Sequence, residues 1–555
     1  MPSKPRPAPI VWALHERPTI PGSAPTPDHH PRLRVAYGLI GLLVGLTGGL
    51  GNALVSVNLA TFQGALGLSP VEAAWIPIVF TMTSVCASIL LFKVRQQFGL
   101  RLFAELGLSV YVLLMIGDLF AQSYGSTLLV RAASGFVGSC LTSMGILYML
   151  QAFPAAHRIK AIIIGMGLST LAIPLARLFS SDLIQVAEWR GLHIFELGLA
   201  LLSLGAVTIL KLPPSDKFKA FEGLDLVSFG LFAGGMALLC AALGLGRVVW
   251  WTEAAWIGWA LCGALILIVS AFVIEHNRKN PLLQTRWMGS ADILRLALVS
   301  ILVRVILSEQ TVGAVGLMTV EGIGSDQLRG LFAIILIATI TGSAVSALTM
   351  NPANLGPPLL AALALMAIGA FMDSDASNLT RPENLYLSQA ILAFAASLFL
   401  APALLFGIAR AMAQGPSYII SFVAVFSGAQ TLGGLMGSAL IGTAQVAREK
   451  FHSSQLVERL NPADPLVAQR LQQLGGAYAR TQPDAALRQA EGGALLGQQA
   501  TREANILAYN DVFLAISVIA ALTFLWIGFL YLRARLRTRR EALALQRANP
   551  ASGNL

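Results

Sequence analysis

Charged side chains are scarce in this sequence. Asp, Glu, Lys and Arg make up 12% of its 555 residues, whereas hydrophobic residues make up 55%. An ordinary soluble domain is about a quarter charged. A water-soluble core cannot bury so much apolar surface, so we expect lipid to surround much of the chain.

Cysteine is also scarce. The four cysteines all fall inside apolar runs, without CxxC spacing or a neighbouring histidine: Cys86, Cys140, Cys240 and Cys262. This pattern argues against a zinc site and against a disulfide framework. The sequence also lacks a Walker A run and the HExxH, GxSxG and haem motifs, so the chemistry of an ATPase or a membrane hydrolase is missing. We expect no enzyme activity, no metal and no cofactor.

Acidic residues are outnumbered by basic ones, 28 against 38, which gives a formal net charge of +10. In a soluble protein such an excess would indicate nucleic-acid binding. Here the basic residues cluster at the ends of apolar runs, and five arginines lie between Tyr531 and Glu541: Arg533, Arg535, Arg537, Arg539 and Arg540. That distribution is typical of membrane orientation, so we expect a lipid bilayer and no nucleic acid as partner.

The sequence contains many long apolar runs. A helix needs about 20 apolar residues to cross the hydrocarbon core. Runs of this kind predict an all-α membrane protein with about fourteen transmembrane helices. The predicted spans are 35–57, 71–92, 102–122, 126–150, 159–181, 191–210, 224–246, 254–274, 293–316, 328–349, 356–372, 385–407, 415–446 and 510–532.

The connecting segments predict the orientation of these spans. Basic residues concentrate in every second connector: Lys93, Arg95 and Arg101, then Arg158 and Lys160, then Lys211, Lys217 and Lys219, then Arg278, Lys279 and Arg286. Cytoplasmic loops carry such an excess of Lys and Arg. We therefore expect the protein to lie in the inner membrane, with both termini in the cytoplasm.

The same pattern divides the chain into segments. We expect two six-helix bundles, 35–210 and 293–532, with two inserted transmembrane helices at 224–274. The expected polar segments are a disordered cytoplasmic tail at 1–34, a cytoplasmic linker at 211–223, a cytoplasmic loop at 275–292, a periplasmic segment with short amphipathic helices at 447–505 and a basic cytoplasmic tail at 533–555.

The second half of the sequence resembles a known family. A run of small residues at Gly433, Gly434 and Gly437 is followed by the stretch Arg448–Glu449–His452, and the run Gln498–Phe513 precedes the last span. These features are similar to EmrB/QacA-type exporters, the 14-helix drug:proton antiporters of the major facilitator superfamily. In the first half, Arg131 and Gly135 resemble the conserved motif of that family's fourth helix.

Other positions of the first half depart from the family pattern. Gly51 stands where such exporters usually carry a first-helix carboxylate. The loop Phe92–Arg101 keeps Gly99 and its arginines but lacks the family's aspartate. The fifth span keeps Pro174 of the antiporter signature but places Arg177 inside the span.

The resemblance implies a fold and a function. The fold would be that of the major facilitator superfamily, with substrate bound between two bundles and carried by alternating access. The function would be export of small amphipathic compounds from the cytoplasm, driven by the proton gradient. Its partners would be the small-molecule substrate, a periplasmic membrane-fusion adaptor and an outer-membrane channel. Two alternatives stay open: a secondary importer or uniporter, and a non-transporting scaffold or sensor.

Ionisable residues inside the spans are the candidate site residues. A charge at the bilayer centre costs roughly 2.5–3.5 kcal/mol on insertion scales, so each such residue indicates a function. Arg131 would be a fixed positive charge paired with a carboxylate, or an arginine that snorkels from a helix end. Glu309 and Glu196 are the deep carboxylates that a proton site needs, although the ninth helix could also simply end at Glu309.

Four further residues complete the candidates. Arg304 makes the ninth span unusually polar together with Ser308, Glu309 and Gln310. Arg177 would bind an anionic substrate, or pair with Asp182 at the outer rim. Asn52 and Asn58 are polar residues of the first span and candidates for the substrate cavity.

Overall fold

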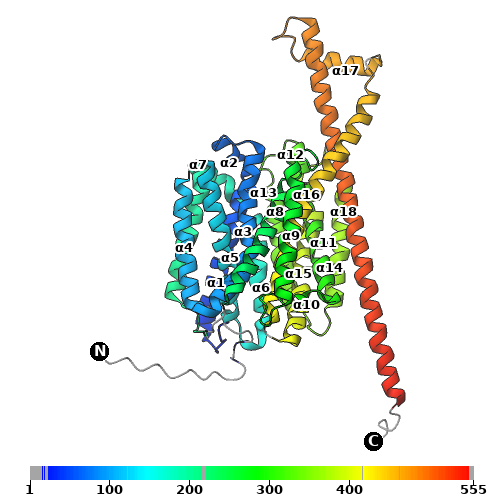
Figure 1. Cartoon of the computed structure of the whole chain (residues 1–555). Helices are drawn as coiled ribbons and strands as arrows, with labels where there is room; N and C mark the ends of the chain where they lie inside the picture. Colours follow the sequence, from blue (N-terminus) through cyan, green and yellow to red (C-terminus); the bar gives the residue numbers. More distant parts are fainter. Residues whose placement is uncertain are drawn as a thin grey trace. The chain divides into compact units, whose positions relative to one another are not determined.

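The computed structural model is built from helices alone in the part of the chain that it describes (Figure 1). That part is Glu16, Pro18 and residues 23–548, without 122, 216, 218–220, 416 and 462, and with side chains described up to Glu541. The chain forms two compact units. Unit 1 comprises Met1–Ala297, Thr339–Thr349 and Leu404–Leu432; unit 2 comprises Leu298–Ala338, Met350–Ala403 and Gly433–Leu555. Four of the five unit boundaries fall inside helices α11, α13, α15 and α16, and the fifth follows the end of α13 at Thr349.

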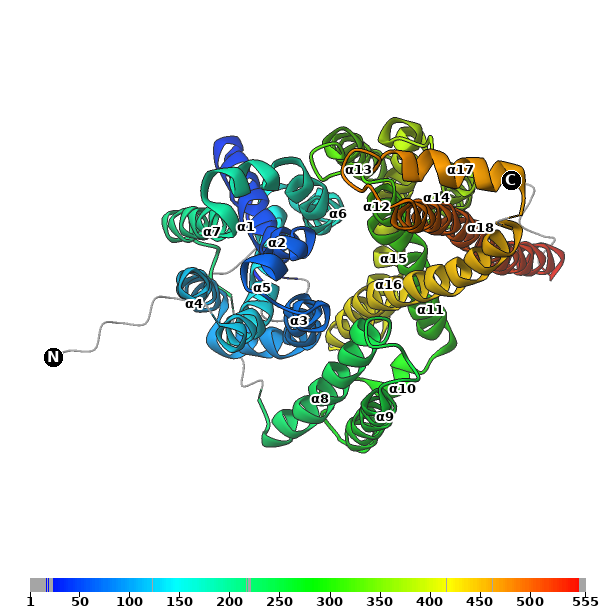
Figure 2. The same ribbon diagram turned by 90° about the horizontal axis from the view of Figure 1, so that it is seen from above.

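Unit 1 holds the first half of the chain and the predicted inserted pair. Its helices are α1 (Pro31–Val57), α2 (Leu59–Ala65), α3 (Pro70–Phe98), α4 (Leu100–Phe120), α5 (Tyr124–Ala152), the 3-10 turn η1 (Ala155–His157), α6 (Arg158–Thr170), α7 (Ala172–Ile209), α8 (Gly223–Leu245), α9 (Ala255–His276) and α10 (Thr285–Met288). Helices α8 and α9 lie side by side, and α8 packs on α3 (Figure 2).

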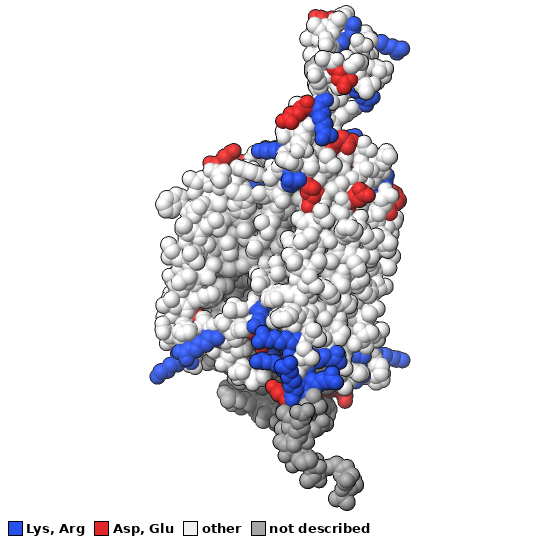
Figure 3. All heavy atoms as spheres, turned by 90° about the vertical axis from the view of Figure 1, so that its right-hand side faces the viewer, with Lys and Arg blue, Asp and Glu red and all other residues white. Residues whose placement is uncertain are grey.

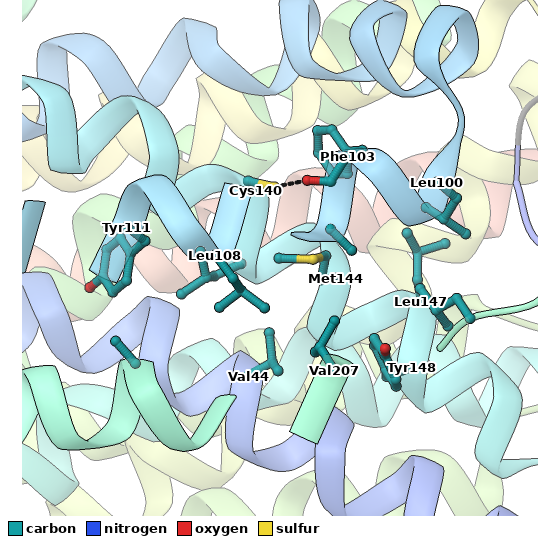
Figure 4. Packing of buried hydrophobic residues seen from close by; sticks show 14 of the residues in the cluster. Val44, Leu100, Phe103, Leu108, Tyr111, Cys140, Met144, Leu147, Tyr148 and Val207 are labelled. Carbon is teal, nitrogen blue, oxygen red and sulfur yellow. Dashed lines mark hydrogen bonds between the residues drawn. The ribbon is translucent and has the colours of Figure 1, made fainter. Parts of the chain in front are cut away.

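The core of unit 1 lies where α1, α4, α5 and α7 meet. Val44, Leu108, Met144 and Val207 each come from a different one of these helices and are buried together (Figure 4). Burial of such a side chain is worth about 1.5–3 kcal/mol in water, but lipid is itself apolar, so close packing matters more here. Tyr111 lies in the same cluster and carries its hydroxyl group to the candidate site.

Unit 2 contains most of the second half. The helices that it holds wholly or in part are α11 (Ala291–Ser308), the π-helical turn η2 (Glu309–Gly313), α12 (Ala314–Val320), α13 (Arg329–Thr349), α14 (Gly356–Met372), the 3-10 turns η3 (Asp373–Asp375) and η4 (Pro382–Leu385), α15 (Tyr386–Gln414), α16 (Tyr418–Arg459), α17 (Pro465–Gly476) and α18 (Ala485–Ala548). Leu317, Phe332, Ala393 and Phe513 belong to its buried core.

Within unit 2, α16 and α18 continue beyond the predicted spans. The end of α16, α17 and the start of α18 form a projecting hairpin, with α17 at its tip (Figure 1). Between Gly442 and Asn461 the sequence has no Gly or Pro to interrupt the helix. The predicted segment 447–505 is therefore mostly a continuation of two long helices, with α17 as its short helix. The predicted tail at 533–555 likewise continues α18 as far as Ala548.

The apolar helices match most of the predicted spans. In the described part of the chain, twelve helical stretches are long and apolar enough to cross a membrane. One of them, Ala155–Ile209, covers both the 159–181 and the 191–210 predictions. The predicted span 293–316 is divided into α11, η2 and α12 and is not among the twelve. The count of about fourteen is thus approximate. One face of the molecule shows basic side chains gathered below a broad uncharged band (Figure 3).

Two irregularities in the helices have local causes. Helix α7 contains a break at Ala187 and Glu188, and Glu188 has a φ of 52°. This left-handed region favours glycine, so the break at Glu188 is strained. The fifth predicted span is also interrupted, at Leu171 between α6 and α7. Pro174 lacks an N–H and its ring clashes with the carbonyl of residue 170, which explains why α6 ends there.

The segment before α1 is held against unit 1. Helix α1 begins at Pro31, after His30 as its N-cap. The side chain of Gln151 donates to the Pro25 carbonyl at 3.0 Å and lies 2.9 Å from His29 Nε2, and Arg158 donates to the Thr26 hydroxyl group. The rest of the predicted 1–34 tail, residues 1–15, 17 and 19–22, lies outside the described residues.

Candidate functional site

Arg131 is buried in the interior of unit 1. It lies two turns into α5, and its side chain is 1% exposed. Its guanidinium group donates to the Gly51 carbonyl at 3.1 Å and to Asn52 Oδ1 at 3.2 Å, both on α1. The ring of Phe80 lies 4.9 Å away on the other side. A snorkelling arginine would reach the surface, whereas this one is fixed between helices.

Glu196 lies next to this arginine site. It is 1% exposed in the second part of α7, and the Tyr111 hydroxyl group donates to its Oε1 at 2.7 Å. The His193 Nδ1 lies 3.7 Å from its Oε2. A Cβ at Gly51 would lie less than 3.0 Å from Glu196 Oε1, so the carboxylate fills the space beside this glycine. Glu196, Gly51 and Arg131 are thereby brought together from three helices.

Asp118, near the end of α4, joins the same group. It is 2% exposed and interacts electrostatically with His193, Arg131 and Glu196. Tyr111, Asp118, Arg131, His193 and Glu196 therefore form one buried set, the Arg131 cluster. No pattern in the sequence joins α4, α5 and α7, which is why Asp118, Tyr111 and His193 were missed.

Glu309 is buried in unit 2, with different partners. The helix does not end there: α11 passes into the π-helical turn η2, which begins with Glu309. Gln389 of α15 donates through Nε2 to both Glu309 oxygens, at 3.0 and 3.2 Å, and to Asp373 Oδ2 at 2.7 Å. The side chains of Glu309 and Asp373 are also hydrogen-bonded to each other. Single-turn π-helices are frequent at functional sites.

Three comparisons place the chain among known proteins, although no family model matches it. It is 29% identical over 239 residues to the "Major facilitator superfamily multidrug transporter mfsC" of Aspergillus fumigatus, which covers 42% of this chain and 45% of that one. It is 23% identical to the "Uncharacterized MFS-type transporter YhcA" of Bacillus subtilis, with 75% and 77% covered. The crystal structure of the human organic anion transporter MFSD10 (TETRAN) shares the fold, with a TM-score of 0.52 at 15% identity, over 89% of this chain and 100% of that one. The chain therefore has the fold of the major facilitator superfamily and is similar in sequence to transporters of that superfamily.

The similarity to these transporters agrees with an all-helical, multi-pass membrane protein. The first relative is matched over less than half of its length, and the second over about three quarters. The sequence coverage and the TM-score therefore support the shared fold.

The remaining candidate residues lie outside the Arg131 cluster or at its edge. Asn52 contacts Arg131 directly, as described above. Asn58 is the C-cap of α1 and donates to the Leu54 carbonyl at 2.8 Å, while Ser180 donates to its Oδ1 at 3.2 Å. Asn58 thus fastens the end of α1 to α7. Arg177 is half-buried in the first part of α7, one turn before Ser181.

Arg304 is explained by the small residues of α16. Gly433 has room only for hydrogen, because a Cβ there would lie 2.7 Å from Arg304 Cβ. A Cβ at Gly434 would lie 3.2 Å from Arg304 Nη2. The glycine run therefore lets α11 and α16 approach closely along the arginine, as small residues do in membrane helices. Arg304 is packed toward α16, whereas the hydrogen bonds of Glu309 go to α15 and η3.

A third set of charged residues links the inserted helices α8 and α9 to α3. Lys93 lies 2.5 Å from Asp225 of α8, and Arg278 lies 2.9 Å from Asp225 and 2.8 Å from both Glu222 and Glu275. Hydrogen bonds from Arg278 and Asn280 hold the pKa of Glu222 below its ordinary value. The sequence assigned Lys93 and Arg278 to cytoplasmic connectors, and the structure shows that both are paired.

Proposed function

We propose that this protein is an inner-membrane secondary transporter that exports small amphipathic compounds by proton-coupled alternating access. The observation that carries the proposal is the Arg131 cluster, in which one arginine and two carboxylates are buried inside a membrane-spanning unit. Such groups are expensive in a bilayer and mark ion or substrate pathways.

The cluster supports a proton-coupling step. Arg131 is held by Gly51 and Asn52, so its positive charge stays in place while the charge of Glu196 changes. A proton that binds Glu196 removes a negative charge facing this arginine and alters which helix arrangement is favoured. Tyr111 keeps a hydrogen bond to the carboxyl group in either state, because a hydroxyl group both donates and accepts. The proton gradient is then the energy source, and no cofactor is needed.

The proposed substrate class rests on sequence similarity. The Aspergillus relative carries the name of a multidrug transporter. The resemblance of the Gly433–His452 region to EmrB/QacA-type exporters points the same way. We therefore assign amphipathic organic compounds as substrates and export as the direction, with cytoplasmic termini.

Transport in inverted membrane vesicles tests this function. Ethidium and tetraphenylphosphonium serve as amphipathic probes, and vesicles energised with an inside-acid gradient should accumulate them. A protonophore should abolish the accumulation, and Glu196→Gln should abolish it while leaving probe binding intact. Flux that ignores the protonophore or runs outward would favour an importer or uniporter. Failure of a broad probe panel to move at all would favour a scaffold or sensor.

A periplasmic adaptor with an outer-membrane channel completes the proposal. The projecting hairpin carries exposed apolar side chains at Val457, Leu466 and Leu487. Its stem is fastened by Asp511, which lies 2.6 Å from both Arg448 and His452. A variant in which a short Gly-Ser turn replaces residues 461–484 should keep vesicle transport and lose drug resistance in intact cells. Resistance equal to that of the unaltered chain would contradict the adaptor.

A further inference from the structure

The hydrogen-bonded carboxyl groups of Glu309 and Asp373 have no cationic partner in the part of the chain that the structure describes. Glu309 is 0% exposed and Asp373 is 3% exposed. Among the described residues, their interactions are with each other, with Gln389 and with Ser388, and no Lys, Arg or His takes part. Two carboxylates with a shared hydrogen bond and no counter-ion cannot both be ionised in a dry site. At least one proton therefore belongs to the pair.

Gln389 gives an independent sign that the site takes up a further ligand. Its side chain is 0% exposed, and its Nε2 faces both carboxyl groups. Its Oε1 is buried and accepts no hydrogen bond from the described residues. A buried amide oxygen without a donor is unfavourable, because it has lost its hydrogen bond to water and gained none in return. A rotated amide would turn this oxygen toward the carboxyl groups, where a protonated carboxyl group is a matching donor.

We propose that Glu309, Asp373 and Gln389 form a second proton-binding site, separate from the Arg131 cluster. One proton is shared by the two carboxyl groups in the conformation described. A second proton binds the remaining carboxylate oxygen, and the Gln389 amide rotates so that Oε1 accepts from the new O–H. The site then alternates between a state in which Gln389 Nε2 donates to the carboxyl oxygens and a state in which Gln389 Oε1 accepts from a protonated carboxyl group.

The surroundings of this site keep other charges away from it. From α18, Phe513 packs against Gly313 of the π-helical turn and Tyr509 packs against Gly316, while Asn510 is bonded to the backbone of Ala376. From η3, the only other titratable group is Asp375, which is exposed. The π-helical turn places Glu309 where α14 ends and α15 begins, so its partners come from helix ends.

Infrared difference spectroscopy of the full chain in lipid nanodiscs tests the site without transport. Low-pH-minus-high-pH spectra should contain a carboxylic acid C=O band from the pair. Glu309→Gln and Asp373→Asn should each remove that band, and Gln389→Leu should shift its position and its pH midpoint. Asp326→Asn, which changes an exposed carboxylate of the same unit, should leave the band unchanged. Size-exclusion profiles establish that each variant is folded.

The outcomes separate this site from the proposed transport function. Glu196→Gln should leave the band unchanged. The band should also be present in the unaltered protein even if no transported probe is found. A wild-type band that persists in both Glu309→Gln and Asp373→Asn would overturn the proposal. A band that disappears in Na+ buffer but not in choline buffer would also overturn it, because the occupant would then be sodium.

Discussion

The carboxylate of Glu196 occupies the space that a side chain at Gly51 would need. A Cβ on Gly51 would lie less than 3.0 Å from Glu196 Oε1 and from the Tyr111 hydroxyl group. Gly51 and Glu196 come from α1 and α7, and they are complementary in size. The family that the sequence resembles places an acid on the first helix, whereas this chain has a glycine there and an acid across from it.

Gly51→Ala should therefore disturb the cluster. The methyl group would push Glu196 away from Tyr111, which breaks their 2.7 Å hydrogen bond. Overpacking of this kind costs about 1–3 kcal/mol. We expect a lower melting temperature and reduced transport. Gly198→Ala on α7 is the matched control, because nothing lies within 4 Å of its added Cβ. Equal effects of the two substitutions would contradict this account.

An exchange of the acid between the helices tests the same relationship more directly. Gly51→Asp and Glu196→Ala should each impair transport, the first by crowding two acids and the second by removing one. The double variant restores one carboxylate beside Tyr111 and Arg131, so it should transport better than either single variant. Neighbouring residues show such non-additive effects when they share an interaction. Purely additive losses would mean that the two positions are independent.

Arg131 should be required for transport and less so for folding. Arg131→Ala removes the donors to Gly51 and Asn52, and we expect transport to fall about tenfold or more, which corresponds to at least about 1.4 kcal/mol. Arg131→Lys should also impair transport, because an ammonium group cannot replace the planar fork that reaches two acceptors. Flux and detergent-solubilised yield are measured for both variants. Normal flux in Arg131→Ala would remove this residue from the mechanism, and lost yield would make it structural.

The sequence predicts the helical, membrane-spanning character of the fold because apolar length alone decides it. It also identifies Arg131, Glu196 and Glu309, since an ionisable residue inside an apolar run stands out. It cannot reveal that Gly51 makes room for Glu196, because that depends on how α1 and α7 pack. Asp373 and Gln389 stand at the edges of apolar runs, where polar residues are ordinary.

The irregular parts of the backbone could not be predicted from the sequence either. In the π-helical turn that begins with Glu309, Gly313 packs against Phe513, a contact between distant parts of the chain that the sequence does not reveal. The break at Glu188 requires a backbone conformation that a glutamate seldom adopts. The glycines at Gly433, Gly434 and Gly437 are visible in the sequence, but the fit of Gly433 against Arg304 could be found only in three dimensions.

Cysteine accessibility should show which side of the membrane the projecting hairpin occupies. In a background with Cys262→Ser, because Cys262 is exposed, a cysteine at Ser454 should react with a membrane-impermeant maleimide added to intact spheroplasts. A cysteine at Ser215 should react only after permeabilisation, since the basic connectors predict a cytoplasmic linker. The reverse labelling would invert the predicted orientation.

The charged group at α3, α8 and α9 should make stability depend on pH. The pKa of Glu222 is held below its ordinary value by hydrogen bonds from Arg278 and Asn280. A lowered folded-state pKa stabilises the protein above the unfolded-state pKa, roughly 4.3 for glutamate, and this contribution is lost as the pH falls through the folded-state value. Wild type should therefore melt higher than Glu222→Gln at neutral pH, and the two curves should converge below roughly pH 4. Glu253→Gln is the control, because Glu253 is exposed and makes no ion pair with the described residues. A difference between wild type and Glu222→Gln that stays constant from neutral pH to acid would show that Glu222 contributes by packing and not by its charge.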